Sequence, residues 1–162
     1  MNDLDELFQQ LPIGDIAAAL GVSEADASAA TGTALPSLVR GLQANATEPA
    51  GASSLWEALR SKDSALVTDG ISLGDVDTAD GAKILGHIFG AQDANVAARL
   101  GGLSGTGKVD SSLMSKLMQM LAPIVMAWIA KKVLGGTSSS GSSSASGGGL
   151  EDLLGGLLGG GR

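Results

Sequence analysis

The sequence contains no cysteine and no tyrosine, and only one histidine, two tryptophans and two phenylalanines among its 162 residues. The absence of cysteine excludes disulfides and thiolate metal sites, and it leaves the redox compartment open. With one imidazole and no thiol, general acid–base chemistry would fall to carboxylates that are scattered along the chain. We therefore predict a protein that is not an enzyme and that uses no cofactor and no metal.

Positive charge is also scarce. The chain has 10 Lys and Arg against 17 Asp and Glu, a formal net charge of −7. Because phosphate contacts supply most of the non-specific affinity for nucleic acids, this balance argues against a nucleic-acid surface. Hydrophobic residues make up 44% of the chain, which is enough for the core of one domain.

The sequence lacks the pattern of a secretory signal and a clear membrane span. The N-terminus, MNDLDELFQQL, is acidic and amphipathic, whereas a signal has a basic start and then an apolar run. The most apolar stretch, residues 113–130, contains Lys116, so only the 14 residues 117–130 are free of charge, whereas a span needs about 20. We interpret the stretch as the core helix of a cytoplasmic protein, with peripheral membrane association as an alternative.

Composition divides the chain into three parts. Residues 135–149, GGTSSSGSSSASGGG, contain only Gly, Ser, Thr and Ala, so they cannot bury apolar surface and are predicted to form a flexible linker. Residues 1–134 then form a helical domain, and residues 150–162 form an amphipathic tail of leucine and glycine.

Helical periodicity dominates the first part, so the predicted fold class is all-α, a compact multihelical bundle. Leu4, Leu7, Phe8 and Leu11 have the spacing of one helix face, and Pro12 should end that helix. The other predicted features are a helix over 16–20 with Asp15 as its N-cap and Gly21 as its stop, a longer helix capped by Ser23 and kinked or split at Pro36, a helix opening at Ser53 or Ser54, an acidic loop over 67–81 that includes Asp69 to Asp80, and helices over 82–89, 93–100 and 111–134.

Two segments of the chain have similar sequences. DIAAALGVS from Asp15 and NVAARLGGLS from Asn95 both read apolar-Ala-Ala-x-Leu-Gly and then a serine, and each precedes a longer apolar helix that contains a proline. We predict two helix-turn-helix-like repeats whose long helices pack on each other, because each needs a partner for its apolar face.

The first repeat has the geometry of a DNA-binding helix-turn-helix, which makes a DNA-associated regulator an alternative function. Its second helix should present Arg, Lys, Asn or Gln to the bases. It begins instead with Glu24 and Asp26, which would repel phosphate, and Arg40, Arg60, Lys62 and Lys83 are dispersed in the sequence.

Three motifs typical of ligand sites are incomplete. GLSGTGK at 102–108 lacks the Ser or Thr of a phosphate-binding loop and follows a predicted helix where a strand is required. The acidic residues from Asp75 to Asp80 do not match the calcium-loop positions. His87 stands alone in ILGHIFG, and we interpret it as a structural histidine that is either hydrogen-bonded at a helix end or partly buried.

The tail carries the strongest hint of function. Leu150, Leu153, Leu154, Leu157 and Leu158 form one helical stripe. Gly155 and Gly156 each cost about 1 kcal/mol of helix stability against Ala, so the tail should fold only on an apolar surface. Its pattern, Leu-acid-acid-Leu-apolar, repeats that of Leu4 to Leu11. Our hypothesis is that the tail occupies the same type of groove as the first helix, in the same chain or in another. The alternative is a loosely attached tail that only covers an apolar patch.

The sequence resembles the YidB-like family of bacterial proteins over about residues 5–134. The resemblance rests on GVS at 21–23, ALPSLVRGL at 34–42, EPAGASSLWEAL at 48–59, and above all on ILGHIFG at 84–90 and LAPIVMAWIA at 121–130. It implies a compact multihelical bundle that is homeodomain-like in part, and no activity or catalytic residue. The long Ser/Gly linker departs from the family pattern.

These observations favour a protein-interaction or self-assembly module whose partner is a protein, including a second copy of itself in a homo-oligomer. The predicted contact residues are the N-terminal stripe of Leu4, Leu7, Phe8 and Leu11 and the five tail leucines.

Overall fold

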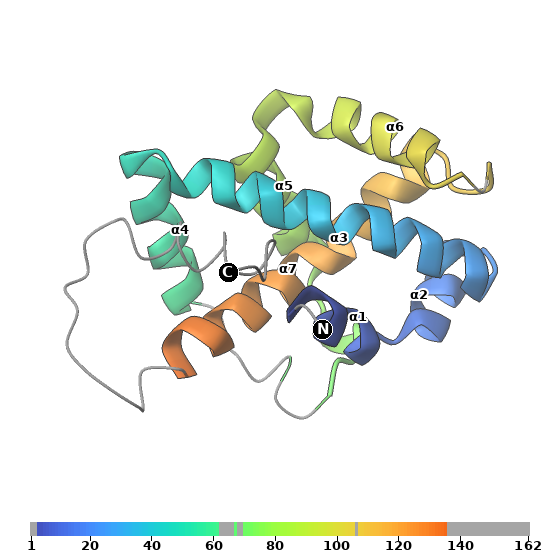
Figure 1. Cartoon of the computed structure of the whole chain (residues 1–162), viewed down its shortest axis with the longest axis horizontal. Helices are drawn as coiled ribbons and strands as arrows, with labels where there is room; N and C mark the ends of the chain where they lie inside the picture. The colour runs from blue at the N-terminus through green and yellow to red at the C-terminus, as the bar shows by residue number, and fades with distance from the viewer. Residues whose placement is uncertain (1–2, 62–66, 68–69, 106, 136–162) are drawn as a thin grey trace, which may run out of the picture.

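The computed structural model describes residues 3–61, 67, 70–105 and 107–135, and throughout these residues the regular structure is helical, which confirms the all-α fold (Figure 1). The described part contains no β-strand. The elements in chain order are α1 (Asp3–Gln10), α2 (Ile13–Leu20), α3 (Glu24–Ala46), α4 (Pro49–Ser61), the 3-10 turn η2 (Leu73–Asp75), α5 (Thr78–Phe89), the 3-10 turn η3 (Gly90–Gln92), α6 (Asp93–Leu103) and α7 (Ser111–Gly135).

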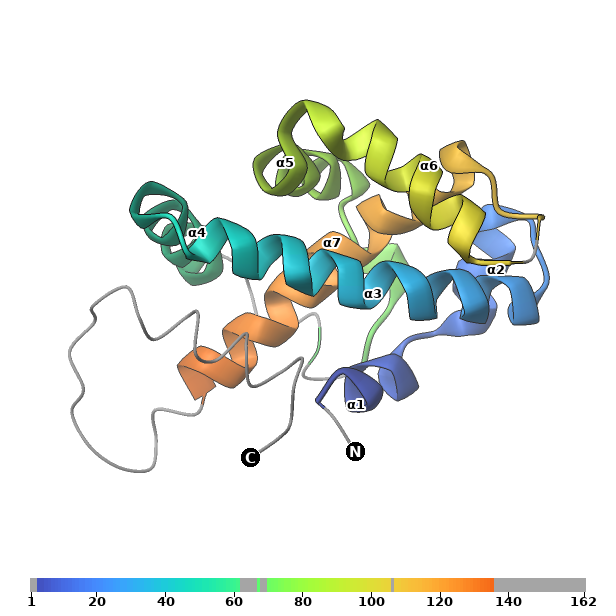
Figure 2. The same ribbon diagram turned by 45° about the horizontal axis from the view of Figure 1, so that its top comes forward.

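The last helix, α7, is the centre of the domain. Every side chain from Met120 to Ala130 is buried, so this stretch of the helix is covered on all sides. It packs against α3, α5 and α6 and also contacts α2 and α4. Figures 1 and 2 show α7 passing beneath α3, with α6 above α3 and with α4 near the C-terminal end of α7. The helix α5 packs against both α7 and α3. The two long helices therefore pack on each other as the sequence predicted.

The prolines do not divide these helices. Pro36 lies inside α3 and Pro123 inside α7, and each helix continues through its proline as one element. The alternative in which Pro36 splits its helix is therefore wrong. Each helix is long and well buried on both sides of the proline, so packing outweighs the one lost backbone hydrogen bond.

The turn between α2 and α3 was partly predicted. Gly21 ends α2 in the left-handed conformation, with φ of 72°, which a residue without Cβ adopts at no steric cost. The Oγ of Ser23 accepts a hydrogen bond from the backbone N–H of Asp26 at 3.1 Å and so caps α3. Asp15 is not the cap of α2, because the helix begins at Ile13 and places Asp15 in its first turn.

Two other helices begin earlier than expected. Proline suits the first turn of a helix, and α4 begins at Pro49. Ser53 and Ser54 therefore lie inside α4, where their hydroxyls donate to backbone carbonyls one turn back. The helix α5 begins at Thr78, because Asp77 Oδ1 accepts from the N–H of Ala79 at 2.9 Å.

The start of α5 corrects the predicted acidic loop. Asp80 lies in the first turn of α5, and residues 73–75 form the turn η2, so the loop is shorter than 67–81. Asp69, at the other end of the predicted loop, lies outside the described residues.

The second half of the proposed repeat differs in detail from the first. The helix α6 continues past Gly101 to Leu103, and Ser104, which aligns with Ser23, donates its hydroxyl to the carbonyl of Gly101 at 2.7 Å. The side chain that caps α7 is Asp110, whose Oδ1 accepts from the N–H of Leu113 at 2.8 Å. The relationship between the two halves as a repeat remains a prediction from the sequence.

Candidate functional site

The N-terminal helix α1 is docked on the core of its own chain. Leu7 is completely buried and Leu11 nearly so, while Leu4 and Phe8 are partly buried against the same core. All four residues of the predicted N-terminal stripe therefore lie together. They occupy an apolar surface that includes α3, which α1 contacts directly.

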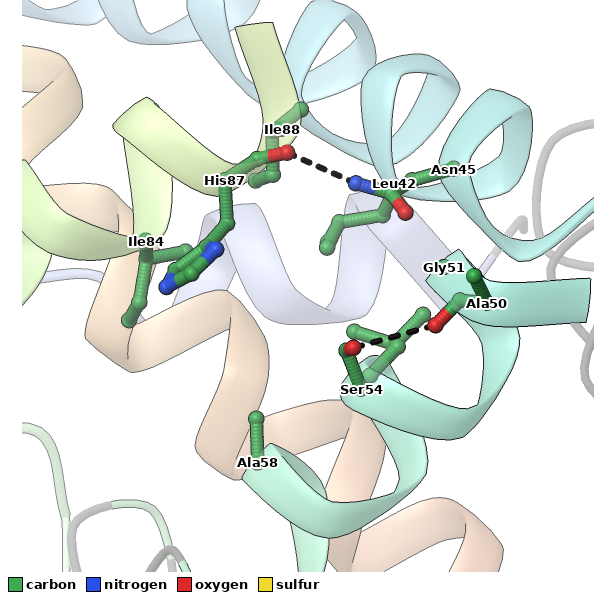
Figure 3. Close-up of a pocket in the computed structure, with 10 residues that line it drawn as sticks. Leu42, Asn45, Ala50, Gly51, Ser54, Ala58, Ile84, His87 and Ile88 are labelled. Carbon is green, nitrogen blue, oxygen red and sulfur yellow. Dashed lines mark hydrogen bonds between the residues drawn. The ribbon is translucent and has the colours of Figure 1, made fainter. Parts of the chain in front are cut away.

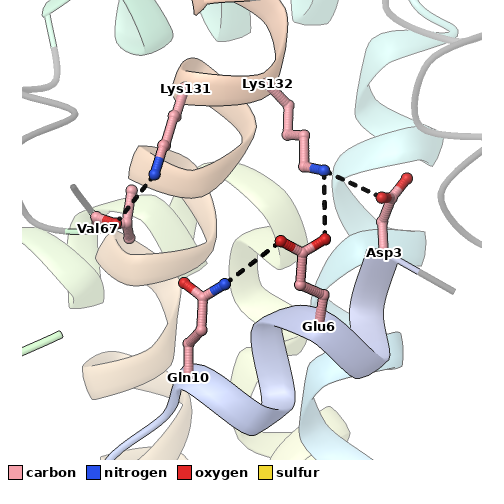
Figure 4. A network of polar contacts seen from close by, with 6 residues as sticks. All are labelled: Asp3, Glu6, Gln10, Val67, Lys131 and Lys132. Atoms are coloured by element: carbon pink, nitrogen blue, oxygen red, sulfur yellow. Dashed lines mark hydrogen bonds and ion pairs between the residues drawn. The ribbon is translucent and has the colours of Figure 1, made fainter. Parts of the chain in front are cut away.

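Polar contacts fasten α1 to the end of α7 (Figure 4). Lys132 Nζ lies 3.1 Å from Asp3 Oδ1 and 3.5 Å from Glu6 Oε2. Gln10 Nε2 donates to the other carboxylate oxygen of Glu6 at 3.5 Å. The hydrogen bond to Asp3 is the main cause of a raised pKa of Lys132, which burial partly opposes. The apolar stripe of α1 thus packs on the core, while Asp3 and Glu6 in its first turn pair with Lys132.

The two lysines at this end of α7 both have partners within the domain. Lys131 Nζ donates to the carbonyl oxygen of Val67 at 3.3 Å. The ammonium group of Lys132 also lies 5.3 Å from the ring centroid of Trp128, within the range of a cation–π interaction. The structure thus gives intramolecular contacts to a basic pair that would also suit a lipid surface.

The tail leucines, Leu150, Leu153, Leu154, Leu157 and Leu158, lie outside the described residues. In sequence, alignment of the tail with α1 places Asp152 at the position of Glu6 and Gly149 at the position of Asp3. A docked tail could thus present a carboxylate to a lysine such as Lys132, although it has no counterpart of Asp3.

Sequence reasoning missed an open apolar groove between α3, α4 and α5 (Figure 3). Its volume is about 290 Å³. Leu42 comes from α3, a stripe of small side chains from α4, and Ile84 and Ile88 from α5; the full lining is Leu42, Asn45, Ala50, Gly51, Ser54, Leu55, Ala58, Ile84, His87 and Ile88. The one signal in the sequence was the i, i+4 spacing of Ala50, Ser54 and Ala58 on one helix face.

His87 lies on this groove. It is exposed near the C-terminal end of α5, and its backbone carbonyl accepts a hydrogen bond from Asn45 Nδ2 at 2.8 Å. That bond ties the end of α3 to the end of α5, so Asn45 fixes the width of the groove at one end. His87 is therefore at a helix end, as one predicted alternative had it, whereas the alternative of a partly buried histidine is wrong, because the residue is exposed.

The motifs for ligand binding find little support among the described residues. No group of three or more His, Asp or Glu side chains there comes close enough together to hold a metal ion. The Asp77 carboxylate caps α5, and the GLSGTGK segment follows the helix α6 where a phosphate-binding loop would follow a strand. Thr106 of that segment lies outside the described residues.

The structure also shows where the surfaces for the two alternative functions, DNA binding and membrane association, would lie. At the start of α3, Ser23 donates to the carboxylate of Asp26, so the position of a recognition helix carries negative charge. Arg40, Arg60 and Lys83 lie on three different helices, and Lys62 is outside the described part. The helix α7 from Ser111 to Lys132 is long and apolar enough to cross a membrane, but 78% of its most apolar window is buried inside the protein.

Fold and site together define an all-α domain with a docked N-terminal helix, an open apolar groove and, in its described part, no metal-binding cluster. The family described as bacterial protein of unknown function (DUF937), to which YidB belongs, matches residues 2–132. The chain belongs to this family, which confirms the resemblance seen in the sequence. Comparison with curated proteins and comparison with solved structures each returned no match.

Proposed function

We propose that this protein is a non-enzymatic interaction module that recognises short acidic, leucine-rich helices, its own tail among them. The observation that carries the proposal is the docking of α1. Leu7 and Leu11 are buried, and Leu4 and Phe8 are partly buried. Lys132 pairs with Asp3 and Glu6 in the first turn. The tail repeats this pattern from Leu150 onward, so it has the chemistry of a second ligand for the same kind of surface.

The tail suits reversible docking. Its glycines weaken the free helix, so part of the gain from burying leucines offsets the cost of ordering the segment. The linker has an r.m.s. reach of roughly 20 Å for 15 residues. Docking in the same chain would cover apolar surface, and docking in a second copy would link protomers into a homo-oligomer.

Sedimentation of the full chain and of a chain truncated after Leu134 tests this proposal. The truncation keeps every buried core residue among those that the structure describes, of which Ala130 is the last. A matched control keeps the full length and replaces the four leucines from Leu153 to Leu158 by serine. Assembly in trans predicts a mass that rises with concentration for the full chain only.

Hydrogen exchange of the same three proteins tests docking in the same chain. Docking in cis predicts amide protection on the domain that is lost equally on truncation and on serine substitution. Identical mass and identical protection in all three proteins would overturn the proposal.

The alternative functions have separate tests. A DNA-associated regulator would show affinity for duplex DNA that falls steeply as salt rises, although the acidic start of α3 opposes it. A membrane-peripheral protein would co-sediment with liposomes without detergent, although α7 is committed to the core. Cytoplasmic location remains part of the proposal, and fractionation of cells that express the protein checks it.

A further inference from the structure

We infer that the groove between α3, α4 and α5 is the receptor for the leucine tail of the same chain. This inference rests on the proposed function, in which the tail docks on an apolar surface, and it names that surface. Among the described residues, two apolar surfaces are candidates for docking of the tail, namely the one under α1 and the open groove.

The surface under α1 is already occupied. To dock there, the tail would have to displace a helix that has Phe8 in its stripe and two carboxylates on Lys132. The tail has Gly149 in place of Asp3, and Gly155 and Gly156 in place of Gln9 and Gln10. It would therefore lose an ion pair and helix propensity relative to the helix that it replaced.

The groove between α3, α4 and α5 is open and has the right size. At about 290 Å³, it lies at the lower limit of pockets for small molecules, roughly 300–1,000 Å³, and suits a few apolar side chains of one helix. The α4 wall carries small residues at Ala50, Gly51, Ser54 and Ala58 beside Leu55, and the small residues let a second backbone approach closely (Figure 3). Ile84 and Ile88 form the facing wall, so leucines at i and i+3 or i+4 of the tail can insert between the walls.

Charge does not oppose docking at this groove. The tail begins with Glu151 and Asp152 on a chain whose net charge is −7. None of the residues that line the groove in the described structure carries a carboxylate, and His87 is the one ionisable group among them. An acidic segment therefore meets no opposing carboxylate among the residues that line the groove.

The C-terminal end of α7 lies at the same end of the molecule as α4, which forms one wall of this groove. The chain leaves α7 at Gly135, α4 contacts α7, and both figures of the fold show α4 and the C-terminal end of α7 at the same end of the molecule. A linker with a reach of roughly 20 Å holds the tail at a high effective concentration near that end. The same chain is therefore the favoured source of the tail.

The absence of native cysteine permits a direct test by disulfide trapping in the full chain. The test pair is Ser54→Cys with Leu154→Cys. The matched control is Ser53→Cys with Leu154→Cys, because Ser53 and Ser54 are neighbours in α4 and both donate to a carbonyl one turn back. Ser54 lines the groove, whereas Ser53 lies on another face with Trp56 and Arg60.

The two pairs are equally near the linker, so they differ mainly in the face of α4 that they sample. In dilute solution in a glutathione redox buffer, we expect the Ser54 pair to form an intramolecular disulfide about ten-fold faster than the Ser53 pair. Peptide mapping identifies the bond, and non-reducing electrophoresis separates monomers from dimers. Dimers linked at Ser54 would show a tail from a second copy and would overturn the assignment to the same chain.

Equal rates for the two pairs would overturn the groove as receptor. The proposed function would survive that result if hydrogen exchange still showed protection that depends on the tail leucines. Loss of that protection, together with unchanged mass, would instead remove the proposed function itself. The two experiments therefore distinguish failure of the groove as receptor from failure of the proposed function.

Discussion

Lys132 Nζ lies 3.1 Å from Asp3 Oδ1, which joins two residues that are 129 positions apart in the sequence. The contact fastens the first turn of α1 to the last turns of the central helix. It is supported by Glu6 at 3.5 Å and by the Trp128 ring below the ammonium group.

The Lys132–Asp3 pair should contribute little and should depend on salt. The side chains are 41% and 44% exposed, so solvent screens the attraction. In a double-mutant cycle of Lys132→Gln and Asp3→Asn, we expect a coupling of about 0.2–1 kcal/mol in the free energy of unfolding that shrinks in high salt. Urea denaturation at two salt concentrations measures it. A coupling that does not change with salt would contradict this origin.

The same ion pair should make the stability of the folded protein depend on pH. The pKa of Lys132 is raised from its ordinary value of 10.5, chiefly by the hydrogen bond to Asp3. Its contribution to stability is therefore complete below the unfolded pKa and is lost as pH rises through the higher folded pKa. Between neutral pH and pH 9, Lys132→Gln should lower stability by a constant amount, and the difference should vanish at more alkaline pH.

Two glycines of α5 should respond oppositely to alanine. A Cβ on Gly81 would overlap the backbone carbonyl of Gln119 on α7, whereas a Cβ on Gly86 would meet nothing within 4 Å. We expect Gly81→Ala to lower the free energy of unfolding by about 2 kcal/mol or more, because backbone must move. Gly86→Ala should raise it by about 0.5–1 kcal/mol through higher helix propensity. Urea denaturation followed by circular dichroism measures both, and equal effects would contradict the close packing of α5 on α7.

Replacing Thr31 by valine should raise the stability of the protein. Its side chain is completely buried in α3, and within the described structure its hydroxyl has no hydrogen-bond partner. Thr31→Val keeps the shape and removes an unsatisfied polar group, so we expect a gain of about 1 kcal/mol in the free energy of unfolding. Thr33, whose hydroxyl donates to the Ala29 carbonyl at 3.1 Å, is the matched control, and Thr33→Val should bring no gain. Equal gains would show that valine acts in some other way.

Docking of α1 should depend on Leu7. Leu7 is completely buried, whereas Leu103 at the end of α6 is 72% exposed. Leu7→Ala should cost about 2–4 kcal/mol in the free energy of unfolding through lost burial and a cavity, and Leu103→Ala should stay within about 0.5 kcal/mol. If Leu7→Ala leaves global stability unchanged but raises hydrogen exchange in α1 alone, the helix is an independent strap rather than part of the cooperative core.

Helix faces could be predicted from the sequence because they depend on local spacing. The stripe of Leu4, Leu7, Phe8 and Leu11, the Ser23 cap and the Gly21 stop are all as predicted. Helix starts were less predictable where several residues compete for the cap. Pro49 begins α4 ahead of Ser53, and the Asp77 cap makes α5 begin at Thr78, four residues before the predicted start at residue 82.

The groove could not be predicted in the same way. Its walls come from α4 and α5, and these helices are brought together through α3 and by the bond from Asn45 to the carbonyl of His87. Each helix alone reads as an ordinary amphipathic element. The contact of α1 with Lys132 could not be predicted either. Both lysines at the end of α7 suit a helix C-terminus, so their positions in the sequence do not indicate a partner.

The central position of α7 has a consequence for how the protein is made. The buried face of α3 rests on a helix that the ribosome synthesises last, with Ala46 and Ala130 separated by most of the domain. At about 5–20 residues per second, the nascent chain presents the apolar face of α3 for roughly 4 to 17 seconds before its partner exists. The domain therefore cannot complete its core around α3 until α7 has been made, late in synthesis.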